Sequence, residues 1–91
     1  MTPSDDLYNR LGLLVSKWGR EHEADMLDLD RHAAQVMAIA NLLGTHLFVA
    51  EQAINEDFAN SLFAAAMRGI LHAHDVCEKA SLELEETAGE A

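Results

Sequence analysis

The longest apolar run of the chain reads LDRHAAQVMAIANLLGTHLFVAEQAI, from Leu29 to Ile54. Its apolar side chains recur at alternating intervals of four and three residues, which is the spacing of a coiled-coil seam on an α-helix. The members of this seam are Leu29, Ala33, Val36, Ala40, Leu43, Leu47, Ala50 and Ile54. Apolar neighbours widen the arc to roughly 220° of the helix circumference, about twice the stripe of an ordinary surface helix. We therefore expect a helix over about Asp30 to Ile54 that must be covered on several sides.

A second seam with the same spacing follows a polar break at residues 55–57. Its members are Ala59, Phe63, Ala66, Ile70, Ala73, Cys77, Ala80 and Leu84. Most of them are small, which lets a neighbouring backbone approach closely. The pattern predicts a helix that packs against residues 30–54 as an antiparallel hairpin. Gly44 and Gly69 lie inside the two helical patterns at a cost of about 1 kcal/mol each, and we interpret them as sites of close helix crossing.

A shorter helix is predicted at the N-terminus. Thr2 as N-cap, Pro3 at the first helical position and Asp5 three residues after the cap form a capping signature. An apolar stripe with helical period follows, made of Leu7, Tyr8, Leu11, Leu14, Val15 and Trp18. We expect Gly19 to end or weaken this helix and residues 20–30 to form a charged loop or frayed turn. Either Asp28 or Asp30 is then the expected cap of the next helix.

The fold class follows from these three patterns. A chain of 91 residues has room for one domain, and no strand pattern is visible in it. The sequence therefore predicts an all-α chain of three helices, in which a long antiparallel hairpin is joined by a shorter N-terminal helix. We expect residues 1–84 to form the domain and residues 85–91 to be an acidic frayed tail.

Self-association is expected because the hairpin is too long for its own chain to cover. The two long helices would measure about 35 and 40 Å, whereas a compact chain of this length has a radius of gyration of about 12 Å. A homodimer that hides about 600 Å² per subunit gains on the order of 15 kcal/mol before association costs. The predicted oligomer interface is made of Val36, Ile39, Ala40, Leu43, Leu47 and Phe48. A polar line of Asn41, Thr45 and Gln52 either fixes the register between copies or faces water.

The charge of the chain is strongly negative. Sixteen acidic residues against six basic ones give a formal net charge of −10. Such a surface repels phosphate backbones and anionic headgroups, which argues against direct binding to nucleic acid or to a membrane surface. The candidate partner-binding acids are Glu21, Glu23, Asp25, Asp28, Asp30, Glu83, Glu85 and Glu86. They either keep a small oligomer in solution or imitate phosphates and occupy a basic groove on a nucleic-acid-binding partner.

The compartment is inferred from the cysteine count and the N-terminus. A single cysteine, Cys77, leaves no internal disulfide, and the acidic start of the chain lacks the features of a signal peptide. We expect a cytoplasmic protein. Residues 33–50 have the length of a membrane span, but Gln35, Asn41 and His46 among them are costly in hydrocarbon. Cys77 itself lies on the second seam, where we expect a buried and inert thiol.

Two alternative functions rest on smaller groups of residues. His72, His74, Asp75 and Glu78 form the densest group of potential metal ligands, which would serve a small metal-binding protein or enzyme. On a helix His72 and His74 point about 200° apart and cannot share one ion, so no metal and no catalytic residue is predicted. The other alternative is a small-ligand sensor, whose apolar pocket is lined by Met37, Phe48, Phe63 and Met67.

The function predicted from the sequence is therefore non-enzymatic and needs no cofactor. We expect a small acidic helical protein, a homodimer or higher homo-oligomer, that binds and inhibits or regulates another protein. In general character it resembles phage-encoded inhibitors of bacterial defence, such as anti-CRISPR proteins, and also small bacterial regulators and immunity proteins. That resemblance implies a protein partner with a basic groove, which the surface carboxylates occupy in place of nucleic acid.

Overall fold

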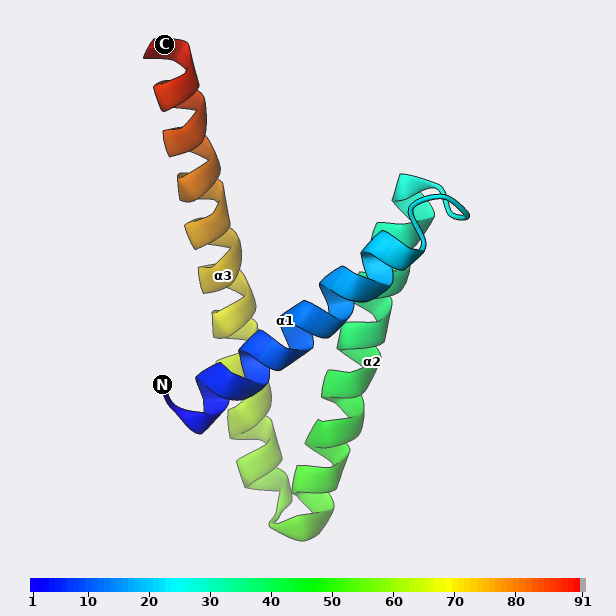
Figure 1. Cartoon of the computed structure of the whole chain (residues 1–91). Helices are drawn as coiled ribbons and strands as arrows, with labels where there is room; N and C mark the ends of the chain where they lie inside the picture. Colours follow the sequence, from blue (N-terminus) through cyan, green and yellow to red (C-terminus); the bar gives the residue numbers. More distant parts are fainter. Residues whose placement is uncertain (91) are drawn as a thin grey trace. The chain divides into compact units, whose positions relative to one another are not determined.

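The computed structural model describes residues 1–90, and the side chains of residues 1–86 (Figure 1). It contains three helices, α1 (Pro3–Glu21), α2 (Asp28–Ala53) and α3 (Glu56–Glu90). No strand occurs among the described residues, which confirms the all-α, three-helix prediction. The chain divides into two compact units, Met1–Gly44 and Thr45–Ala91, and α2 contributes to both. That residues 1–84 act as one domain, and that two copies complete a bundle, both stay predictions.

Helix α1 begins where the capping signature places it. The Asp5 backbone N–H donates to Thr2 Oγ1 at 3.1 Å, and the Thr2 N–H donates to Asp5 Oδ2 at 3.2 Å. With Pro3 in the first turn, this reciprocal pair satisfies backbone donors that have no partner inside the helix. The prediction that Gly19 ends the helix is wrong, because α1 continues to Glu21 and is capped at its C-terminus by His22.

Gly19 serves a different purpose, which is close approach between α1 and α2 in the first unit. It is buried, and the Gln35 amide Nε2 donates to the carbonyl oxygen of Val15, one turn earlier on α1, at 3.1 Å. A Cβ at position 19 would lie 2.6 Å from that same Nε2. The glycine therefore leaves room for a polar side chain of α2 to reach the backbone of α1.

This contact predicts an energetic coupling between Gly19 and Gln35. In the wild-type chain Gly19→Ala gains about 1 kcal/mol of helix propensity but displaces Gln35 and loses a hydrogen bond worth about 1 kcal/mol, so its net effect on stability is small. With Gln35→Ala already present, Gly19→Ala is expected to stabilise the protein by about 1 kcal/mol. Urea unfolding of the four variants at one protein concentration measures the coupling. Equal effects of Gly19→Ala in both backgrounds would contradict it.

Several predicted boundaries need correction. The loop covers only residues 22–27, because α2 begins at Asp28, so neither Asp28 nor Asp30 is the residue before the helix. Leu27 takes that place, and its carbonyl oxygen accepts from the Arg31 N–H at 2.9 Å. Helix α3 continues to Glu90, so the predicted frayed tail is helical over residues 85–90, while Ala91 lies outside the described residues.

The break between α2 and α3 is correctly predicted. Asn55 precedes α3, and its side-chain Oδ1 accepts from the Phe58 backbone N–H at 2.8 Å, while Glu56 and Asp57 occupy the first turn. A Cβ at Gly44 or Gly69 meets nothing within 4 Å, and the interpretation of these glycines as sites of close helix crossing stays a prediction, because they belong to different units.

Very little apolar surface is buried in this chain. Among the described residues Ala59 in the second unit is the only buried apolar side chain, at 7% exposure. Leu47, Ala50 and Ala66 of the same unit are half-buried. Large apolar side chains on all three helices remain exposed. The fold therefore consists of well-formed helices whose apolar faces are still open to a further partner.

Candidate functional site

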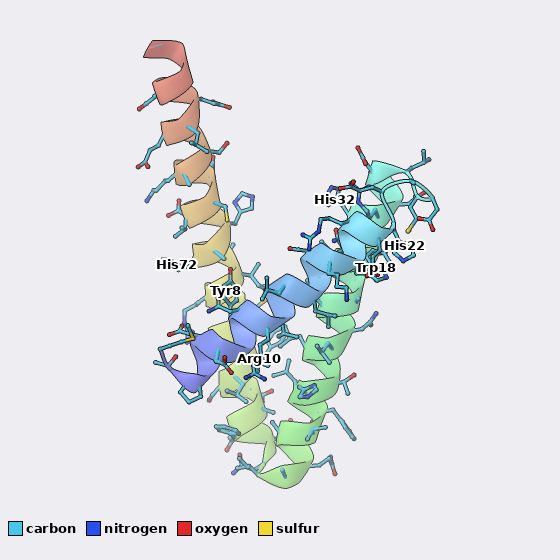
Figure 2. The ribbon with its side chains drawn as sticks, viewed as in Figure 1. Tyr8, Arg10, Trp18, His22, His32 and His72 are labelled. Atoms are coloured by element: carbon cyan, nitrogen blue, oxygen red, sulfur yellow. The ribbon has the colours of Figure 1, made fainter. Side chains whose placement is uncertain are left out.

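The loop between α1 and α2 carries the first group of predicted acids and is held by local contacts. The Met26 N–H donates to the carbonyl oxygen of His22 at 3.1 Å. Trp18 and His22 lie side by side, with ring centroids 4.5 Å apart (Figure 2). The other side of the His22 ring is tied to the loop, since its Nδ1 lies 3.1 Å from Asp25 Oδ1. These contacts fix the turn that presents the acidic side chains.

The net charge of this loop region is modest. Glu21 lies 4.0 Å from Lys17 Nζ, and Asp28 Oδ1 lies 2.9 Å from Arg31 Nη2. Five acids and three bases occupy residues 17–31, which leaves a formal charge of −2. The Lys17–Glu21 pair is exposed and adds little stability, about 0 to 1 kcal/mol, whereas the Arg31 side chain is only 12% exposed. Both pairs offset the field of the carboxylates. The loop is therefore a weaker attractor for a basic partner than its acid count indicates.

The second group of acids lies near the end of α3. Glu83, Glu85 and Glu86 are exposed on this helix, and no basic residue follows Lys79 in the sequence. The nearest base, Lys79, lies one helical turn before Glu83. The two acidic groups belong to different compact units.

The residues of the predicted oligomer interface on α2 are only partly buried by the chain itself. Leu43 and Leu47 are half-buried, whereas Ala40 and the large side chains of Val36, Ile39 and Phe48 are exposed. Val36 keeps 64% of its surface. Several exposed large apolar side chains on one face of a helix are typical of a protein-binding surface.

Two apolar cavities in the first unit were not predicted. They have volumes of about 480 and 490 Å³ and share Leu14 and Val15 of α1 and Ala38 of α2. One also contacts Trp18, Ala34 and Gln35, and the other extends along Tyr8, Leu11, Ile39 and Leu42. The small side chains of Ala34 and Ala38, one turn apart on α2, were the available signal for the close approach of α1. The predicted pocket of Met37, Phe48, Phe63 and Met67 draws on both units and coincides with neither cavity.

The histidines of α3 do not form a metal site in the described structure. No group of three or more potential ligands comes together among the described residues. His74 Nδ1 lies 3.9 Å from Glu78 Oε2, and Asp75 Oδ2 lies 3.0 Å from Lys79 Nζ. The residues of the metal alternative thus pair along one exposed helix surface, as ordinary i, i+4 neighbours do.

Cys77 is exposed, so the expectation of a buried thiol is wrong. The seam on which it lies is open at that level of α3.

The hydropathy of α2 is high for an exposed helix. By length and composition it is the one helix of the described chain apolar enough to cross a membrane, with a mean hydropathy of 1.5 in its most apolar window. Core helices of water-soluble proteins meet the same criterion. In the first unit Gln35 of this helix donates a hydrogen bond to the Val15 carbonyl oxygen of α1.

Comparisons with known proteins give no further guide. No protein-family model, no curated protein and no solved structure matches this chain. Any inference about function therefore depends on the surfaces described above.

Proposed function

We propose that this protein is a non-enzymatic, self-associating helical protein that binds and inhibits or regulates a protein partner through its acidic surface. The observation that carries the proposal is the open apolar surface: the described chain buries one apolar side chain, Ala59, and exposes large apolar residues on every helix. A chain with so little core gains stability by burying those faces against another protein.

Self-association through α2 buries one part of this open apolar surface. Val36, Ile39, Ala40 and Phe48 provide an exposed apolar face, and Leu43 and Leu47 extend it. Burying each large aliphatic side chain contributes about 1.5 to 3 kcal/mol. Several such side chains from each of two copies supply enough to offset the cost of association, which is on the order of 10 kcal/mol.

The acidic end of α3 is the surface that we assign to the partner. Glu83, Glu85 and Glu86 carry three charges within four residues, and residues 76–90 hold five acids and one base, a formal charge of −4. Carboxylates presented on a regular helix imitate a row of phosphates, and a basic groove that binds nucleic acid accepts such a surface. The loop between α1 and α2 is secondary, since its bases reduce its charge to −2.

The test compares two variants that remove the same number of charges. Immobilised protein is used to capture partners from a native lysate at about 50 mM and at about 300 mM salt, because exposed charge contacts weaken as the Debye length falls. Replacing Glu83, Glu85 and Glu86 by glutamine is expected to weaken capture of a salt-sensitive partner at least tenfold. The control, Glu23→Gln with Asp25→Asn and Asp30→Asn, is expected to weaken it much less. Capture that ignores salt, or that ignores the α3 variant, would contradict the proposal.

A further inference from the structure

We draw no further inference here: the strongest candidate, the apolar cavity of about 480 Å³ between α1 and α2 of the first unit, beside Trp18 and Gln35, carries none because nothing in the structure shows what covers it.

Discussion

Val36→Glu is expected to weaken self-association by at least about 100-fold, or about 2.7 kcal/mol. Val36 lies at the N-terminal end of the α2 face and is 64% exposed in the single chain. Pairing through this face buries the side chain, so the variant loses about 1.5 to 3 kcal/mol of apolar burial and also places a charge against a second copy. Sedimentation equilibrium or light scattering over a range of concentrations measures the change.

If the protein functions as a monomer, the opposite result is expected for Val36→Glu, so the experiment distinguishes the two cases. A substitution at an exposed helix position changes stability by at most about 0.5 kcal/mol, so a protein that functions as a monomer would tolerate Val36→Glu. Leu13→Glu is the control, because Leu13 is equally exposed on α1 and lies outside the predicted interface. If both variants keep the mass of the wild type, or if Leu13→Glu alone dissociates it, the α2 interface is misplaced.

The parts of the fold that the sequence predicted correctly are those governed by local chemistry. Thr2 with Asp5, and Asn55 with the Phe58 N–H, satisfy backbone donors within four residues of themselves. Such signals can be read without knowing what lies across the helix. The seam periodicity likewise depends only on residues of one helix, and it placed both long helices correctly.

The errors arose where a distant segment decides the outcome. Gly19 looked like a helix end because glycine is a poor helix former, but its place is set by Gln35, sixteen residues away. Cys77 looked buried because its seam is apolar, yet burial needs a partner helix, which the second unit does not provide at that level.

The sequence predicted which acids form the candidate surfaces, but not how much of their charge is offset by neighbouring bases. The acids at the α1–α2 loop and on α3 lie where the sequence placed them, in exposed positions. Net charge separates the two groups: residues 17–31 hold five acids and three bases, a formal charge of −2, whereas residues 76–90 hold five acids and one base, a formal charge of −4. Which carboxylates meet a base depends on helix boundaries and rotamers, which composition does not contain.

Ala59→Glu is expected to destabilise the second unit by about 2 to 4 kcal/mol, which is a large part of the stability of a small protein. Ala59 is 7% exposed in the first turns of α3. Two effects oppose each other there. A negative charge near a helix N-terminus gains about 0.3 to 1 kcal/mol from the helix dipole, whereas an unpaired carboxylate in a buried position costs several kcal/mol.

The cost of burying the carboxylate exceeds the gain from the helix dipole. Ala59→Glu is therefore expected to lower the free energy of unfolding. Ala65→Glu provides the comparison, since it adds the same side chain to the same helix at an exposed position. Urea unfolding followed by circular dichroism at a fixed protein concentration gives both stabilities. A destabilisation by Ala59→Glu no greater than that of Ala65→Glu would mean that the chain is not packed around Ala59 at the α2–α3 turn.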